Sequence, residues 1–319
     1  MTISKAAFAK VQSLYGKESV MKLSEANSDV EFESTGSLYF DYILGGGFPR
    51  GRVIEIYGPE SSGKTTAAIH AIAETQKAGR NALFVDAEHA FDKVYAEKLG
   101  VNVEEMALCQ PDNGEQGLDV AIAMIETGEV QLVIIDSTSA LTPKSELEGE
   151  MGDAAMGVQA RMLSKGLRKI AGVASRHNCT VIFISQIREK IGPYGGQAIG
   201  VGNAMKYYAS QRISIRKSTP IEVDKIAVGH TMIIESKKNK VYPPFKLCEV
   251  ILKYGEGYDT RSEVVSMAAE LDIVKKTGAW YSYGDTKLGQ GLGNVSALLA
   301  DNPELYEELK KKVTESMKK

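Results

Sequence analysis

Short apolar runs alternate with longer amphipathic segments between residues 52 and 185. Nearly continuous apolar strands that alternate with helices are typical of a parallel sheet covered on both faces. The pattern therefore predicts an α/β core in which a mostly parallel sheet is flanked by helices. The runs that mark its strands are Val53–Tyr57, Ala82–Asp86, Leu132–Asp136 and Thr180–Ile184.

The segment that precedes this core predicts one separate helix. Over residues 5–16, Phe8, Val11 and Tyr15 recur at helical spacing, and Gly16 is a typical helix stop. A polar, acidic stretch then separates this helix from the core. Its apolar stripe must pack against another surface. The sequence leaves open whether this surface is the core of its own chain or another subunit.

The pattern changes again in the last third of the chain. Residues 212–216, 231–235 and 248–254 alternate between apolar and polar, which predicts antiparallel strands. Short helices and a Tyr/Gly-rich segment follow. We therefore expect three parts, namely an N-terminal helical arm for oligomerisation (residues 1–30), a core (31–259) and a small α+β C-terminal domain (260–319).

Composition and charge limit the class of protein. The 319 residues are 43% hydrophobic and 25% charged, as in a soluble globular protein, and no apolar stretch reaches the ~18 residues of a membrane span. The first residues lack the charged and then apolar pattern of a signal peptide. The three cysteines are odd in number and lie far apart along the chain, which indicates reduced thiols. We therefore expect a cytoplasmic protein. Because the net charge is −3, any nucleic acid has to bind at local basic patches.

One motif carries specific chemistry. It matches GxxxxGK[ST] in full, directly after a predicted strand and at the start of a predicted helix, which is the context that this phosphate loop needs. Its glycines let backbone N–H groups curl around a polyphosphate, the lysine reaches the β- and γ-phosphates, and the threonine hydroxyl holds Mg²⁺. The motif predicts a nucleotide site formed by Gly58, Pro59, Glu60, Ser61, Ser62, Gly63, Lys64 and Thr65.

Acidic residues that follow two neighbouring strands would complete such a site. Asp136 ends an apolar run at the carboxyl edge of the sheet, where α/β ligands bind, so we expect it to hold Mg²⁺ together with Thr65. Glu88 follows another strand at the same edge, where a carboxylate can activate water as a general base. Asp86 and His89 are rivals for that role by position.

Further motifs run along almost the whole chain after the phosphate loop. They are Val85–Ala90, Gln110–Asp112, Asp136–Ser137, Leu141–Lys144, Glu148–Glu150, Gln186–Arg188, Lys190–Gly192, Gly202–Ala204, Lys238–Lys240, Tyr254–Gly257 and Gly278–Tyr283. In this order they resemble the bacterial RecA recombinase family, with one small gap in a loop. The resemblance implies a RecA-type P-loop NTPase core and a DNA-dependent ATPase. Such a protein uses ATP and Mg²⁺, forms filaments on single-stranded DNA and exchanges strands with a homologous duplex in recombination, DNA repair and the SOS response.

The resemblance also implies roles for single residues. The family places ATP between adjacent subunits of a helical filament, which makes hydrolysis depend on assembly. By position, Glu88 would activate water, and Gln186 would sense the γ-phosphate and pass the signal to the DNA loop that follows it. Four further positions match contacts to adenine (Asp92 and Tyr95) and to the ATP of a neighbouring subunit (Lys238 and Lys240).

Two loops and a helix would contact DNA. The glycine-rich loop over residues 192–202 follows the sensor glutamine, and loops of this kind usually order on ligand contact. Backbone amides and nearby cations suit phosphate contact without sequence preference. The resemblance adds positions in an acidic loop and on the helix after it. The expected DNA-binding residues are Met156, Arg161, Ser164, Arg168, Arg188, Lys190, Gly202 and Asn203.

A few positions depart from the family pattern. Ser185 stands where asparagine is usual before the sensor glutamine, and Val201 stands where glycine is usual. The glycine-rich loop is also slightly shorter, with Pro193 and Tyr194 where apolar residues are common. Because Val201 restricts φ, we expect altered coupling of ATP to DNA and unchanged phosphate binding.

Other functions share parts of this pattern. A DNA-dependent motor of the hexameric helicase type has the same nucleotide core, whereas a small-molecule phosphotransferase would need a closing lid with arginines, which residues 192–202 lack. In a structural alternative, ATP-bound filaments coat DNA and hydrolysis only recycles them. Members of the family often stimulate self-cleavage of a LexA-type repressor, and the sequence leaves open whether this chain does.

Residues 300–319 bear on duplex binding. They carry five acidic and five basic residues, whereas many relatives end in a strongly acidic tail that restrains duplex binding. We therefore expect invasion of duplex DNA at a lower Mg²⁺ concentration than tailed relatives require.

Overall fold

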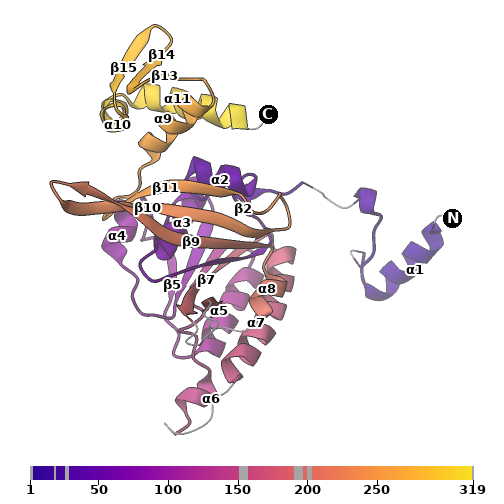
Figure 1. Ribbon diagram of the computed structural model, residues 1–319. Coiled ribbons are helices and arrows are strands. Elements are labelled where there is room, and N and C mark those ends of the chain that lie inside the picture. Colours follow the sequence, from indigo (N-terminus) through magenta and orange to yellow (C-terminus); the bar gives the residue numbers. More distant parts are fainter. Residues whose placement is uncertain are drawn as a thin grey trace. The chain divides into compact units, whose positions relative to one another are not determined.

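The computed structural model describes residues 3–17, 19–25, 29–150, 157–189, 197–199 and 203–317, with the backbone alone at 188–189 and 197–199 (Figure 1). The chain forms two compact units, Met1–Glu31 and Phe32–Lys319. Among the described residues, no helix combines the length and the apolar character that crossing a lipid bilayer requires.

The first unit contains the predicted N-terminal helix. Helix α1 spans Lys5–Tyr15, and the Ser4 side chain caps its start. It ends at Gly16, whose φ of 96° favours glycine. A short 3₁₀ turn, η1, follows at Leu23–Glu25. None of the residues of α1 is buried: in the part of the chain that the structure describes, Val11 and Tyr15 of the apolar stripe are exposed and Phe8 is half-buried.

The second unit is built on a sheet of ten strands among the described residues. Its main order is β12-β11-β10-β9-β3-β7-β6-β4-β5, and β8 pairs with the end of β7. From β3 to β5 neighbouring strands run parallel, as predicted, and from β9 to β12 they run antiparallel. Strand β9 was expected only in antiparallel pairing, but its other neighbour is β3, to which it runs parallel. The strands are β3 (Val53–Gly58), β4 (Asn81–Asp86), β5 (Ala107–Cys109), β6 (Val130–Asp136), β7 (Thr180–Glu189), β8 (Gln197–Ile199), β9 (Gln211–Val223), β10 (Ile226–Asn239), β11 (Leu247–Lys253) and β12 (Gly257–Tyr258).

Alternation along the central strands divides the core into two layers. Ile54 and Ile182 pack into one layer beneath α3, whereas Val181 and Phe183 pack into the other beneath α5 and α7. Helices on both faces therefore cover the parallel strands, which explains their continuous apolar character. The helices and short strands around the sheet are β1 (Phe32–Glu33), α2 (Leu38–Leu44), β2 (Phe48–Pro49), α3 (Lys64–Lys77), α4 (Lys93–Lys98), α5 (Gly114–Glu126), α6 (Lys144–Leu147), α7 (Val158–Arg176) and α8 (Ala204–Tyr208).

The antiparallel part of the sheet extends further than the sequence pattern predicted. Strands β9 and β10 continue as a long hairpin beyond residues 212–216 and 231–235. In the outer part of this hairpin most side chains of both faces are exposed, so burial did not impose an alternation there. The short strands β5 and β12 were missed because each contributes only two or three residues to the sheet.

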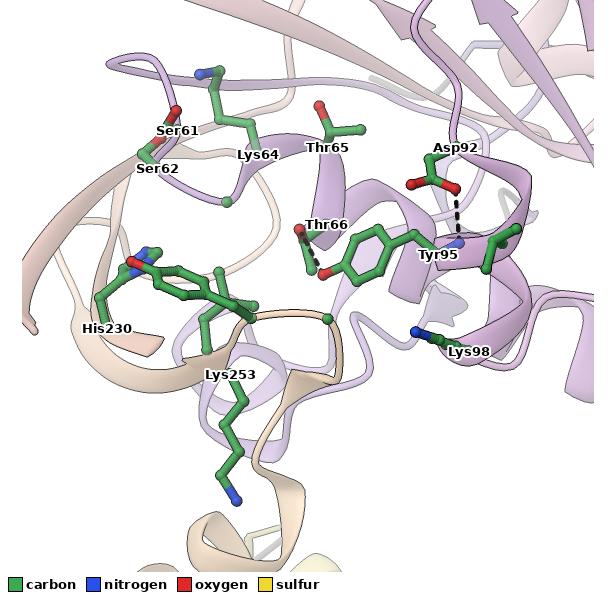
Figure 2. A pocket seen from close by; sticks show the side chains of 15 residues that line it. Ser61, Ser62, Lys64, Thr65, Thr66, Asp92, Tyr95, Lys98, His230 and Lys253 are labelled. Carbon is green, nitrogen blue, oxygen red and sulfur yellow. Dashed lines mark hydrogen bonds between the residues drawn. The ribbon is translucent and has the colours of Figure 1, made fainter. Parts of the chain in front are cut away.

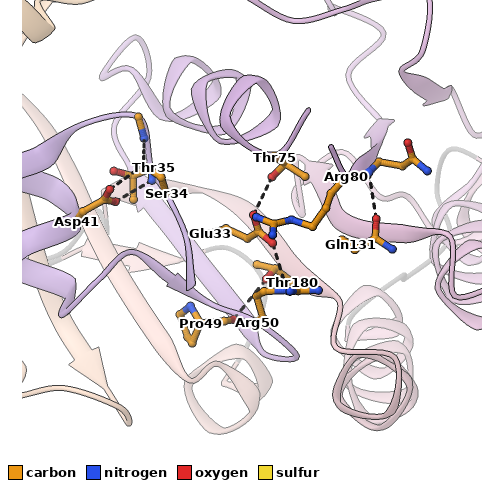
Figure 3. A network of polar contacts seen from close by, with 12 residues as sticks. Glu33, Ser34, Thr35, Asp41, Pro49, Arg50, Thr75, Arg80, Gln131 and Thr180 are labelled. Carbon is orange, nitrogen blue, oxygen red and sulfur yellow. Dashed lines mark hydrogen bonds and ion pairs between the residues drawn. The ribbon is translucent and has the colours of Figure 1, made fainter. Parts of the chain in front are cut away.

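A buried ionic network closes the amino edge of the sheet (Figure 3). The Glu33 carboxylate is fully buried and pairs with Arg50 at 3.3 Å and Arg80 at 2.5 Å. The Thr75 hydroxyl near the end of α3 also donates to it, at 3.3 Å. A carboxylate removed from water needs several donors. Because the donors to Glu33 come from different segments, the network joins β1, α3 and the chain before β4.

The C-terminal part of the second unit has its own small core. Leu309 and Val313 of α11 are buried in it together with Tyr281, whereas Trp280 is 51% exposed. The aromatic segment thus divides between core and surface. Its elements are α9 (Thr260–Glu270), β13 (Lys275–Thr277), β14 (Trp280–Tyr283), β15 (Thr286–Gln290), α10 (Leu292–Asp301) and α11 (Pro303–Met317).

Helix α9 is tied to the large core by one carboxylate. Glu263 is buried and accepts hydrogen bonds from the Ser37 hydroxyl at 2.5 Å and from the Leu38 and Tyr39 amides at 3.0 Å. It thereby satisfies backbone donors at the start of α2. Burial raises the pKa of Glu263 to about 6, although these three donors oppose the shift.

Candidate nucleotide-binding and catalytic site

The phosphate loop lies between β3 and α3, where two of its glycines make close contacts. A Cβ atom on Gly58 would lie 1.9 Å from the Ile215 carbonyl oxygen of β9. Gly63 has a φ of 94°, and a Cβ atom there would lie 2.8 Å from the Met232 sulfur. Both positions therefore require glycine, and the loop is held against the antiparallel part of the sheet.

The loop leaves backbone donors available at the start of α3. Gly63 is the N-cap residue of α3 and supplies no side-chain cap, so the first N–H groups of the helix are free to meet an anion. Ser61 has a φ of 55°, which turns the loop, and the Ser62 side chain is buried. The Lys64 ammonium donates to the Pro59 carbonyl at 2.6 Å, while Glu60 is exposed.

Strand register brings the predicted residues to one edge of the sheet. Gly58 at the end of β3 is paired with Gln186 of β7, and Asp86 of β4 is paired with Asp136 of β6. Because these strands are parallel, their carboxyl ends meet at the same edge. The phosphate loop and the predicted metal, water and sensor residues thus share one location.

Thr65 and Asp136 are in direct contact. The Thr65 hydroxyl donates to the Asp136 carboxylate at 2.7 Å. Burial raises the pKa of Asp136 to about 6, and Glu88 adds to the shift, while the Thr65 hydroxyl and Lys64 oppose it. Burial likewise lowers the pKa of Lys64, against the attraction of Asp136 and Glu88. The two groups therefore favour a ligand that supplies compensating charges, as Mg²⁺ and phosphate do.

Glu88 is held by two donors, one from strand β7 and one directly after strand β6. The Gln186 amide donates to Glu88 Oε1 at 3.0 Å, and the Ser137 hydroxyl donates to the same oxygen at 2.5 Å. The Ser139 hydroxyl lies 2.8 Å from that of Ser137. Glu88 itself is exposed at the sheet edge, so its carboxylate is accessible to water.

Asp86 has a different environment. Its buried carboxylate accepts from the amides of Ala90 and Phe91, both at 3.1 Å, and from the Gln110 side chain at 3.0 Å. A carboxylate with these partners shapes the loop after β4 and is not accessible as a base. This contact pattern separates Asp86 from Glu88, which position along the chain could not do.

A cavity of about 530 Å³ opens beside the phosphate loop (Figure 2). Asp92 and Tyr95 line it, and the Tyr95 hydroxyl lies 3.2 Å from Thr66. Asp92 also accepts from the Tyr95 amide at 2.9 Å and so caps α4. The opposite wall was not predicted as part of the site. It is formed by His230, Lys253, Tyr254 and Gly255, of which the last two stand in a motif that could have indicated them.

Lys238 and Lys240 lie at the other edge of the sheet. Lys238 is paired with Arg212, which is paired in turn with Glu55 near the start of β3. Its ammonium donates to the Lys206 carbonyl of α8 at 2.6 Å. Burial lowers the pKa of Lys238, and the nearby Lys240 and Arg212 add to the shift. The structure therefore does not bring this pair to the phosphate loop of its own chain.

The predicted DNA-binding residues are placed in part. Arg161 and Arg168 are exposed on α7 with the half-buried Ser164 between them. The Arg168 guanidinium donates to the Tyr208 hydroxyl of α8 at 3.3 Å, and Asn203 directly precedes α8. Helices α7 and α8, which carry or adjoin these residues, are therefore in contact. Met156, Lys190 and Gly202 are outside the described residues, as are Pro193, Tyr194, Val201 and the side chain of Arg188.

Comparison with known proteins gives one consistent family. The RecA N-terminal domain family matches residues 2–259, and the RecA C-terminal domain family matches residues 262–318. Protein RecA of Porphyromonas gingivalis is 52% identical over 98% of this chain and 93% of its own. Protein RecA of Bacteroides thetaiotaomicron is 50% identical over 98% and 96%, and that of Halalkalibacterium halodurans is 49% identical over 97% and 90%. The chain therefore belongs to the RecA family, and it is a DNA-dependent ATPase of homologous recombination and DNA repair.

Proposed function

We propose that this chain hydrolyses Mg²⁺–ATP at sites completed by a neighbouring subunit, with Glu88 as the general base. The observation that carries this proposal is the pair of donors on Glu88. The carboxylate is held by Gln186 and Ser137 at the edge where the phosphate loop begins. A base that is oriented by two fixed donors and still accessible to water fits the activation of an attacking water molecule.

The residues around the phosphate loop fit a magnesium nucleotide. Mg²⁺ takes hard oxygen ligands and usually binds through one or two protein groups plus phosphate oxygens. The Thr65 hydroxyl and the Asp136 carboxylate, already 2.7 Å apart, supply such a set. Lys64 and the free amides at the start of α3 would bind the phosphates, while Asp92 and Tyr95 would face the base.

Gln186 is suited to report the state of the nucleotide. Its amide contacts Glu88, and its backbone belongs to β7, which runs on toward the glycine-rich loop. A γ-phosphate near Glu88 would compete for the amide and shift the end of this strand. Ser185 departs from the family pattern, and its buried hydroxyl accepts from Thr138 at 3.0 Å. We propose that this hydrogen bond to Thr138 takes the place of the side-chain contact that asparagine makes at the same position in other members of the family.

DNA contact is proposed for the cationic face of α7 and the two loops beside it. Arg161, Ser164 and Arg168 recur at helical spacing on that face, and Arg168 contacts α8. Exposed cations and small polar groups in this arrangement suit contact with a sugar–phosphate backbone without sequence preference. Met156, Arg188, Lys190, Gly202 and Asn203 complete the proposed set by family position.

Assembly would complete the nucleotide site. Because Lys238 and Lys240 lie away from the phosphate loop of their own chain, we propose that they act on the ATP of the adjacent subunit. The exposed stripe of α1, in residues 1–30, would dock on a neighbouring subunit in the same filament. Residues 260–319 would form the C-terminal domain beside the core at 31–259. The presence of the protein in the cytoplasm and a LexA-type repressor as a further partner are proposed from the family alone.

The decisive test is ATP turnover of the wild type and of Glu88→Gln, each with and without single-stranded DNA and at several protein concentrations. We expect cooperative stimulation by DNA in the wild type and a loss of at least about a hundredfold in the variant. Glu105→Gln, the same change at an exposed glutamate elsewhere, serves as the control. Full turnover by Glu88→Gln would refute the assignment of the base.

The same variant separates the alternatives. If Glu88→Gln still pairs and exchanges homologous strands on ATP binding, hydrolysis serves filament recycling, as in the structural alternative. A helicase-type motor would instead unwind duplexes without needing homology. Strand exchange between a circular single strand and a linear homologous duplex therefore decides between these readings.

A further inference from the structure

One side chain of α7 contacts the loop that holds the proposed base. Gln159 is the second residue of α7 and is half-buried. Its amide nitrogen lies 3.2 Å from the carbonyl oxygens of Thr138 and Ser139 and 3.1 Å from that of Leu141. An amide group has two hydrogens, so three acceptors share them. A single side chain thus contacts three backbone carbonyls of the segment after β6.

That segment is the one that orients Glu88. The Ser137 hydroxyl donates to the Glu88 carboxylate at 2.5 Å, and the Ser139 hydroxyl lies 2.8 Å from the Ser137 hydroxyl. The Thr138 amide donates to the Ile184 carbonyl at 2.8 Å, which anchors the segment to β7. The carbonyls held by Gln159 therefore lie directly after Ser137, whose hydroxyl contacts the base. Gln159 reaches Glu88 through Ser137 and not through Gln186.

Gln159 belongs to the same helix as some of the proposed DNA-binding residues. Gln159 lies two residues before Arg161 and five before Ser164 on the same helix. Helix α7 begins directly after Gly157, a residue in the left-handed conformation that is the last of the acidic loop, residues 148–157. A shift of the start of α7 when DNA binds would move the Gln159 amide relative to the three carbonyls. Because α7 is a rigid element, such a shift would reach the loop at residues 138–141 directly.

We propose that Gln159 is a positioning residue that couples DNA contact on α7 to the orientation of Glu88. This second connection works alongside the sensor Gln186 and rests on the proposed roles of Glu88 and of the α7 surface. It also explains why a polar side chain at the start of α7 turns toward the core instead of toward solvent. Its three contacts are all with backbone, so they constrain position without adding charge near the base.

The test compares Gln159→Met with Gln76→Met. Methionine keeps the length of the side chain and removes its donors. Gln76 is a matched control, because it too joins a helix to a loop: its amide donates to the Asn102 carbonyl at 2.9 Å and its oxygen accepts from the Asn102 amide at 2.8 Å. It lies in the second half of α3, away from Glu88.

Five quantities are measured for each protein: turnover with saturating single-stranded DNA, turnover without DNA, KM for ATP, affinity for a fluorescent oligonucleotide, and the melting temperature. We expect Gln159→Met to lower the stimulation ratio about tenfold, a size typical of residues along a coupling network. KM and DNA affinity should stay within about twofold, and Gln76→Met should keep the full ratio. Restoring an amide in Gln159→Asn should recover part of the ratio.

The outcomes separate this inference from the function on which it rests. If the wild type is not stimulated by DNA, or if Glu88→Gln keeps its turnover, the proposed function fails and the coupling fails with it. If both behave as proposed and Gln159→Met keeps its stimulation ratio, only the coupling role is refuted. Equal losses of both turnovers together with a lower melting temperature would also refute it, because they indicate a purely structural role.

Discussion

The proposed action of Lys238 and Lys240 on a neighbouring subunit can be tested by mixing two inactive variants. Lys64→Ala removes the phosphate-loop lysine, which acts within its own chain. The double variant Lys238→Ala, Lys240→Ala removes the pair that acts across the interface. Each variant alone should lose nearly all DNA-stimulated turnover, since every site in its filament lacks one of the two contributions.

The separation within one chain follows from strand pairing. Lys238 is paired with Arg212, which is paired with Glu55, three residues before Gly58 of the phosphate loop. Two strand spacings of about 4.8 Å and three residues of about 3.3 Å place the backbone of Lys238 about 14 Å from Gly58, whereas a lysine side chain reaches only about 6 Å. Lys238 therefore cannot reach the nucleotide of its own subunit by any change of rotamer.

Mixing restores complete sites in a predictable share. In a random 1:1 filament, a site is complete when its phosphate loop comes from the double variant and its neighbour is Lys64→Ala. Each condition holds at half of the positions, so about one quarter of the sites should regain turnover. The assay is ATP hydrolysis on single-stranded DNA as the ratio of the two variants is changed, with a maximum expected at equal amounts.

A second mixture supplies the control. Lys64→Ala and Glu88→Gln both carry their defect on the phosphate-loop side, so every site in their mixture is defective and no turnover should return. Light scattering on single-stranded DNA confirms that each variant assembles. Absence of recovery in the first mixture, with assembly intact, would refute action across the interface, and so would full activity of the double variant alone.

Two further predictions concern stability. Glu33→Gln should lower the free energy of unfolding by about 3 kcal/mol in urea, because Arg80 and Arg50 would lose their buried carboxylate; affinity for an ATP analogue should stay the same, and a loss below about 1 kcal/mol would contradict this account. His70 accepts from the Tyr258 amide at 3.1 Å, and burial lowers its pKa to about 4. Since an unfolded histidine titrates near about 6.5, the unfolded chain binds more protons between these values. This stabilisation is complete above the upper value and is lost as the pH falls toward the lower one. Between pH 7 and pH 5, His70→Gln should therefore lose about 2 kcal/mol less unfolding free energy than the wild type, and parallel pH profiles would refute the assignment.

The sequence predicted those features that depend on residues close together along the chain. The phosphate loop, the strand before it and the helix after it follow from glycine spacing and from apolar runs. The parallel strands were predictable because burial on both faces imposes near-continuous apolar residues. The outer parts of β9 and β10 could not be predicted, because most of their side chains are exposed and burial imposes no apolar pattern on them.

The choice among acidic residues required the tertiary structure. Asp86, Glu88 and His89 follow the same strand, and their positions along the chain are almost equivalent. What separates Asp86 from Glu88 is the set of donors that contacts each carboxylate: loop amides and the distant Gln110 occupy Asp86, while the distant Ser137 and Gln186 orient Glu88.

The sequence by itself determined the family, the phosphate loop and the positions of the central parallel strands along the chain, because these rest on residue types at fixed spacing. Only the tertiary structure decided that Tyr254 lines the nucleotide cavity, that Gln159 contacts the loop after β6, and that Lys238 lies at the far edge of the sheet. The physical reason is that parallel and antiparallel pairing sets which end of a strand meets which edge, and this pairing joins residues that are distant along the chain.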